Sequence, residues 1–145
     1  MQRSYSSTII FLFLLSLSAN HLAQAQAIFS HDFENGLNPM KVVDVDNRNP
    51  HPDKANFDGE WSVKLTSEGA VGVQSSWYSP AGQSDDWLIT PAISITDANT
   101  QLRWQARAFN ANFREDYEVL LSTTDDATSS FIQPLFDMEG ERTTW

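Results

Sequence analysis

The feature that most constrains the fold of this chain is an alternation of apolar and polar residues with a period of two. In Leu102–Ala108 (LRWQARA), every second residue is apolar and the others are Arg or Gln. Tyr117–Leu121 repeats the pattern in part. Because successive side chains of a β-strand point to opposite faces, this spacing predicts strands with one buried face. The side chains that we expect to point inward are Trp87, Trp104, Val119 and Leu121.

The segment Trp77–Pro91 (WYSPAGQSDDWLITP) predicts a loop that leads into a short buried strand. A turn rich in Ser, Pro and Gly comes before Asp85 and Asp86, and the apolar run Trp87–Ile89 follows. Pro91 ends this run, because proline has no N–H to donate to a continuing ladder.

The rest of the chain beyond residue 25 is typical of an all-β protein. Turn signals such as Asn35-Gly36 and Asp58-Gly59 separate short apolar runs, and no window keeps the spacing of an amphipathic helix. The polar stretch Asp44–Asp58 is typical of a long surface loop between strands. We therefore predict a two-sheet antiparallel β-sandwich.

The N-terminus has the three parts of a secretory signal peptide. Arg3 supplies the positive charge, Ile9–Leu17 is an uninterrupted apolar run, and a small-x-small cleavage site ends at Ala25 or Ala27. The apolar run is about half of the roughly 20 residues that a membrane span needs. We expect residues 1–25 to be a signal peptide, residues 26–145 to form one exported domain, and no membrane insertion after cleavage.

The acidic composition excludes several kinds of partner. The chain has 9 Lys and Arg against 19 Asp and Glu, a formal net charge of −10. Nucleic acids and anionic membranes bind clustered positive charge, so neither is an expected partner. The chain has no cysteine, so stability must come from an apolar core, or from a core and a metal ion.

The residues offer no catalytic motif, and we predict that the chain is not an enzyme. There is no G-x-S-x-G elbow, no H-E-x-x-H helix and no glycine-rich phosphate loop. Asp85 and Asp86 are neighbours on an extended segment, so their side chains point to opposite sides and cannot face one substrate together. We expect them to be solvated acids where the strand begins.

The segment Trp77–Pro91, followed by Ala92–Thr96 (AISIT) and Leu102–Ala108, resembles the choice-of-anchor J or cleaved-adhesin domains of secreted Bacteroidetes proteins. The resemblance covers roughly residues 29–145. It implies a jelly-roll sandwich of the galactose-binding or MAM-like kind. It also implies further strands after Trp145, so we expect a domain truncated at its C-terminus; the alternative is a genuinely short, atypical domain.

The same resemblance implies a non-catalytic adhesion or ligand-binding module, secreted or on the cell surface, with a host or environmental glycan or protein as its ligand. Export by the type IX secretion system is implied in the same way. Two alternatives stay open from the sequence. The domain could accompany the catalytic part of a secreted protease or glycosidase, or it could be a structural spacer.

A structural calcium ion is the cofactor that the resemblance implies. Phe29–Gly36 (FSHDFENG) matches the family's first strand and has Glu34 in the place of a calcium ligand, with its acidic partner expected beyond Trp145. The alternative for Glu34 is an ordinary carboxylate at the end of a strand.

The polar loop offers a second set of oxygen ligands. Asp44, Asp46, Asn47 and Asn49 are spaced like the start of an EF-hand, but Asn49 stands where glycine is needed and Ala55 where glutamate is needed. The EF-hand match therefore fails. Hard-oxygen binding by an irregular loop stays open.

Trp77 and Tyr78 are the candidate ligand-binding residues. Ser, Pro and Gly surround them in a loop, and an exposed aromatic ring there could stack on a sugar or anchor a partner protein. The alternative is that Trp77 folds back as a lid over the core.

Overall fold

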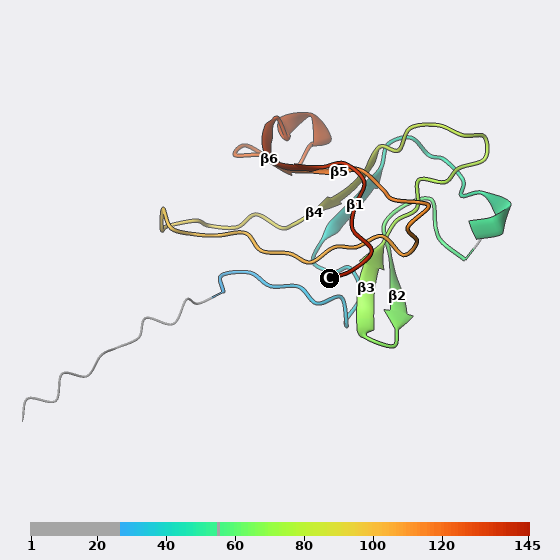
Figure 1. Cartoon of the computed structure of the whole chain (residues 1–145). Helices are drawn as coiled ribbons and strands as arrows, with labels where there is room; N and C mark the ends of the chain where they lie inside the picture. The colour runs from blue at the N-terminus through green and yellow to red at the C-terminus, as the bar shows by residue number, and fades with distance from the viewer. Residues whose placement is uncertain (1–26, 55) are drawn as a thin grey trace, which may run out of the picture.

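The computed structural model describes residues 27–54 and 56–145, so the predicted signal segment lies outside the described residues (Figure 1). The described part is all-β, which confirms the predicted fold class. Its six strands form three antiparallel pairs, and its helical elements are two single 3₁₀ turns. The elements are β1 (Lys41–Asp44), η1 (Pro52–Lys54), β2 (Ser62–Thr66), β3 (Gly69–Val73), β4 (Asp86–Ile89), β5 (Tyr117–Leu121), η2 (Thr128–Ser130) and β6 (Gln133–Met138).

Strands β2 and β3 form a tight hairpin. Thr66 pairs with Gly69 across a two-residue turn, and the Thr66 hydroxyl donates a 2.8 Å hydrogen bond to the carbonyl of Gly69. Gly69 has a φ of 113°, a conformation that side chains with a Cβ rarely adopt. The turn therefore depends on this glycine.

Strands β1 and β4 pair although more than forty residues of chain separate them. Lys41 lies opposite Ile89, and Asp44 lies opposite Asp86. The apolar middle of each strand explains the pairing, because Val42 and Val43 meet Leu88 and Trp87. The buried strand predicted between the paired acids and Pro91 is confirmed as β4, in which Ile89 is 4% exposed.

Strands β5 and β6 form the third pair. The register shifts between Val119 and Leu120, and Leu120 lies opposite Pro134. A proline has no N–H for the ladder, so an irregularity at this position is expected. The same proline explains why sequence patterning did not predict β6.

The apolar core is small and lies around the buried side chains Val73, Tyr78, Ile89 and Ala108. Trp87, Val119 and Leu121 are half-buried. Trp87 packs at a tilt against Phe131, with 5.7 Å between ring centroids.

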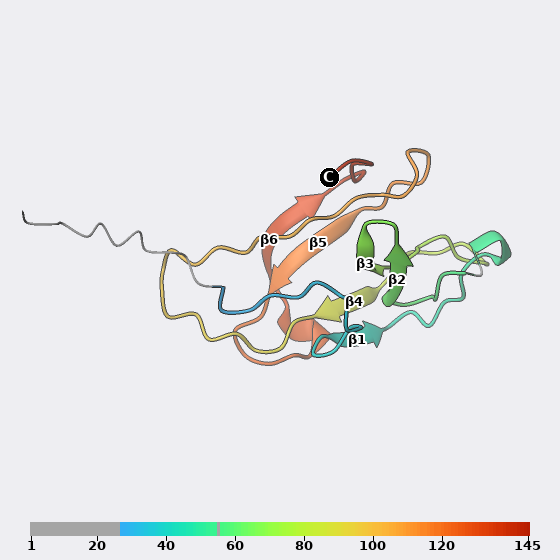
Figure 2. The ribbon, with the colours of Figure 1, turned by 90° about the horizontal axis from the view of Figure 1, so that it is seen from below.

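The prediction that Trp104 points inward is wrong, because its side chain is 43% exposed. The segment 102–108 is extended but forms no named strand, and in the view of Figure 2 it runs along the β5–β6 pair. Trp104 lies against Phe136 edge to face and donates its indole N–H to the Tyr117 hydroxyl at 3.1 Å. The alternation in residues 102–108 therefore places the Trp104 ring against the β5–β6 pair, but the ring stays partly exposed.

The motif Phe29–Gly36 is also not a strand in this structure. The amide of Glu34 donates to the carboxylate of Asp32, and the amide of Gly36 donates to the carbonyl of Phe33. These local hydrogen bonds compete with ladder formation and fold the segment into turns. No helix in residues 27–54 and 56–145 has the length and apolar character to cross a membrane.

Candidate metal centre

The β1–β4 register brings three carboxylates together. Asp44 lies opposite Asp86 at the ends of the two strands, and Asp46 follows in the loop after β1. Each of the three places a carboxylate oxygen within 4.8 Å of the oxygens of the other two. All three residues are half-buried, so water only partly screens their mutual repulsion.

The loop after β1 is folded around its own carboxylates. The amide of Asn47 donates to Asp44 Oδ1 at 2.6 Å, and the amide of Arg48 donates to Asp46 Oδ1 at 2.8 Å. The other oxygen of Asp46 accepts the amide of Asp85 at 2.8 Å. These bonds fix the directions of the two carboxylates, with Asn47 in the left-handed region at a φ of 52°.

Asp86 accepts more side-chain hydrogen bonds than the other two acids do. Its Oδ2 accepts hydrogen bonds from the Tyr78 hydroxyl at 2.5 Å, Gln74 Nε2 at 2.7 Å and the Ser84 hydroxyl at 2.7 Å. Its Oδ1 is buried and has no hydrogen-bond partner among residues 27–54 and 56–145. A buried acceptor left unpaired costs about 1–3 kcal/mol, and more when it is charged. The prediction that Asp85 and Asp86 are both solvated is therefore wrong for Asp86.

Tyr78 belongs to this network and has no free aromatic face. The residue is 2% exposed. Burial, followed by the hydrogen bond to Asp86, raises the pKa of Tyr78 well above its ordinary value. The phenol therefore stays protonated and donates its hydrogen bond to Asp86 Oδ2.

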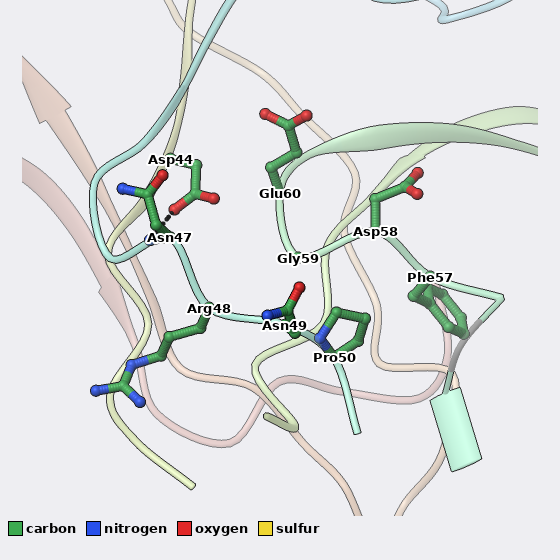
Figure 3. Close-up of a pocket in the computed structure, with 9 residues that line it drawn as sticks. All are labelled: Asp44, Asn47, Arg48, Asn49, Pro50, Phe57, Asp58, Gly59 and Glu60. Atoms are coloured by element: carbon green, nitrogen blue, oxygen red, sulfur yellow. Dashed lines mark hydrogen bonds between the residues drawn. The ribbon is translucent and has the colours of Figure 1, made fainter. Parts of the chain in front are cut away.

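The donor set fits a hard divalent cation. Three converging carboxylates offer only oxygen ligands, and oxygen ligands suit Ca²⁺ and Mg²⁺. The unpaired Oδ1 of Asp86 supplies a lone pair that no donor of the described residues uses. Arg48 does not neutralise the cluster, because its Nη1 is 3.5 Å from the carbonyl of Pro80 and Figure 3 shows its side chain directed away from Asp44.

Glu34 lies elsewhere. Its side chain is exposed, and Oε1 accepts the amide of Ala70 at 3.0 Å, where β3 begins. It is not one of the three clustered acids. Its role as a calcium ligand stays a prediction.

Trp77 is the centre of an aromatic stack beside the loop. Its ring is nearly parallel to those of His51, with 4.5 Å between centroids and a 10° interplanar angle, and Phe113, with 5.1 Å and 13°. Lys54 Nζ lies 5.7 Å from the Trp77 ring centroid. The amide of His51 also donates to the carbonyl of Trp77 at 2.7 Å, so the stack ties the loop between β1 and β2 to the segment before β4.

A pocket of about 430 Å³ opens next to the carboxylate cluster and shares Asp44 with it (Figure 3). Its lining is mostly polar and comes from the loop between β1 and β2. The lining residues are Asp44, Asn47, Arg48, Asn49, Pro50, Phe57, Asp58, Gly59 and Glu60.

The sequence indicates parts of this centre but does not show that they lie together. The EF-hand-like spacing singled out Asp44 and Asp46, and Asp86 was noted only as one of a pair. Gln74 and Ser84 were missed, because neither residue belongs to a motif. The signal that could have joined these parts is the pairing of β1 with β4, which the strand patterns alone do not specify.

One comparison with known proteins finds a relationship. The family model described as the Cleaved Adhesin Domain matches residues 27–143. No curated protein and no solved structure matches the chain. Because the family model covers most of the chain, this protein belongs to the cleaved adhesin domain family.

Proposed function

We propose that this chain is a calcium-stabilised adhesion module that binds a glycan or protein ligand outside the cell. Family membership indicates an adhesion-related extracellular module on a surface or secreted protein. The ligand and the calcium ion are the parts that we add, and we assign no catalytic step to the chain.

Two observations carry the calcium proposal: Asp44, Asp46 and Asp86 converge, and Asp86 has a buried Oδ1 with no hydrogen-bond partner among the described residues. Three like charges at this spacing destabilise the folded chain unless a cation lies among them. Calcium accepts six to eight oxygen ligands in flexible geometry, which suits carboxylates from a strand pair and an irregular loop.

Calcium at this position would act on the ligand-binding surface through the loop between β1 and β2. One end of the loop carries Asp44 and Asp46, and His51 in its middle stacks on Trp77. Fixing the end of the loop therefore limits the movement of the stack. Phe113 stacks on Trp77 and is 49% exposed, so its ring offers an apolar surface to a ligand.

We infer that Trp77 contributes to ligand binding mainly as the residue that supports this surface. Its ring is half-buried and already contacts two other rings. Tyr78, the next residue along the chain, is held by the hydrogen bond that its hydroxyl donates to Asp86.

The test is thermal unfolding with and without calcium. A ligand that binds only the folded state, present at a hundred times its dissociation constant, stabilises by about 2.7 kcal/mol. We expect calcium to raise the melting temperature of the wild-type chain and to have little effect on Asp46→Asn. Asp53→Asn is the matched control, because it removes the same charge from an exposed position in the same loop.

Equal calcium responses in the Asp46→Asn and Asp53→Asn variants would contradict the proposed centre. If calcium has no effect on any variant while the chain still attaches to a glycan array or a protein ligand, the adhesion proposal stands without the metal. If neither response is observed, the spacer alternative is favoured.

A further inference from the structure

A buried carboxylate that the proposed metal centre does not use lies after β6. Glu141 is 8% exposed, although glutamate is rarely buried without a partner. Two hydrogen bonds from backbone amides place it there: the amide of Glu141 donates to the carbonyl of Glu115 at 3.0 Å, and the amide of Gly140 donates to the side chain of Asp116, at Oδ1, at 2.6 Å. The chain thus holds Glu141 beside Glu115 at the base of the β5–β6 hairpin.

Glu115 connects this base to the segment that carries the aromatic stack. Its carboxylate accepts a hydrogen bond from the hydroxyl of Ser76, the residue before Trp77. Trp77 in turn stacks on Phe113, two residues before Glu115. The contacts of Glu115 therefore join the Ser76–Trp77 segment to the hairpin.

The surroundings of Glu141 disfavour its negative charge. Burial raises the pKa of Glu141, and the charge on Glu115 raises it further. Other charged groups of the packed segments are engaged elsewhere or are exposed: Asp116 accepts the Gly140 amide, Arg107 is paired with Glu68, and Arg114, Glu139 and Arg142 are exposed. Glu115 is the charged group that acts on Glu141.

We propose that Glu115 and Glu141 form an acid-strengthened clasp, in which uptake of a proton by this pair tightens the attachment of the Ser76–Trp77 segment to the base of the β5–β6 hairpin. A neutral Glu141 carries no buried charge and no longer repels Glu115. Glu115 then keeps the Ser76 hydroxyl as its donor. The proposal does not depend on calcium or on the identity of a ligand.

The direction of the pH effect follows from the raised pKa of Glu141. A carboxyl whose folded-state pKa lies above its unfolded value binds a proton more tightly in the folded chain. Its contribution to stability is complete below the ordinary glutamate value of 4.5 and is lost as the pH rises through the raised pKa. The exposed Asp125 and Asp126 have lowered pKa values and act at lower pH, so they do not mask the effect.

The first experiment compares the melting temperatures of the full chain, Glu141→Gln and Glu139→Gln between neutral pH and the ordinary glutamate pKa. Glutamine imitates the protonated acid, so Glu141→Gln should melt higher than wild type at neutral pH, and the gap should close as the pH falls. Glu139 is exposed and two residues away, so Glu139→Gln corrects for the loss of one charge from an acidic protein. Identical curves for the two variants would overturn the proposal.

The second experiment needs no stable variant at Glu141. The ¹³C carboxyl shifts of wild-type Glu141 and Glu139 are followed through a pH titration, and Glu141 should titrate at the higher pH. Amide hydrogen exchange at residues 75–77, corrected for the intrinsic pH effect, should slow as Glu141 takes up its proton. In Ser76→Ala this slowing should disappear while the titration of Glu141 remains. The clasp would be refuted if Glu141 titrates with an ordinary midpoint, or if amide exchange at residues 75–77 does not change as Glu141 takes up its proton.

Discussion

Asp44 and Asp86 lie directly opposite each other at the end of the antiparallel pair β1–β4, so two carboxylates share one face of a two-stranded ladder. Like charges in this position weaken strand pairing. The hydrogen bonds on Asp86 Oδ2 offset part of the repulsion, and a bound cation would offset more. The pairing most sensitive to the ionic conditions should therefore be that of β1 with β4.

The first prediction concerns the support of Asp86 by Tyr78. Tyr78→Phe removes the donor at 2.5 Å from Asp86 Oδ2 and should lower the free energy of unfolding by about 1.5–3 kcal/mol, the range for a hydrogen bond to a charged group. Chemical denaturation would measure the change. Tyr117→Phe is the control, because its hydroxyl meets the exposed Trp104 and should matter less. Equal losses in the two variants would argue against the Asp86 network.

The second prediction separates the two calcium sites. Asp46→Asn should remove the calcium response of the three-carboxylate cluster, whereas Glu34→Gln should leave it nearly intact, because the acidic partner that the family resemblance implies for Glu34 is expected beyond Trp145. The calcium-dependent rise in melting temperature, measured in the single and double variants, checks this. A double variant that still responds would show that calcium binds elsewhere.

The third prediction concerns the aromatic stack. Trp77→Ala removes two stacked contacts, each worth about 0.5–1.5 kcal/mol beyond area burial, so it should destabilise the chain by about 1–3 kcal/mol and weaken ligand attachment. Trp145→Ala should lower the free energy of unfolding by less, because Trp145 is 55% exposed and its ring packs on the guanidinium of Arg107. Denaturant unfolding and a surface-attachment assay would check both. Loss of attachment with unchanged stability would mean that Trp77 touches the ligand directly.

The fourth prediction concerns residues 102–108, which alternate like a strand but lie largely exposed. Leu102 is 56% exposed, so Leu102→Asp should change the free energy of unfolding by less than about 0.5 kcal/mol, as is usual for surface substitutions. Ile89→Asp places the same charge in the core and should prevent stable folding. Circular dichroism melts would compare them. A large loss of stability in Leu102→Asp would mean that residues 102–108 belong to the apolar core.

Local patterns predict two of the strands and fail where tertiary pairing decides. Tyr117–Leu121 and the run before Pro91 became β5 and β4, as the patterns predict. Leu102–Ala108 has the clearest alternation in the chain, yet it lies unpaired beside β5, because alternation specifies a face and not a partner strand.

The candidate site was predictable only in pieces for the same reason. Asp44 and Asp46 are close in sequence and were noticed together, but Asp86 reaches them through a pairing that spans the intervening hairpin. No sequence motif indicates that Glu141 is buried, because its burial depends on the backbone hydrogen bond to Glu115. Side chains that act across distant segments are visible only after the register is known.

The distance along the chain between Asp44 and Asp86 also has a kinetic consequence. An unfolded chain must first close the long loop between β1 and β4, so the three-carboxylate cluster assembles late in folding. An ion that binds a late-forming cluster slows unfolding and leaves the folding rate nearly unchanged. Calcium would then lengthen the lifetime of the folded module on a surface more than it would help the nascent chain to fold.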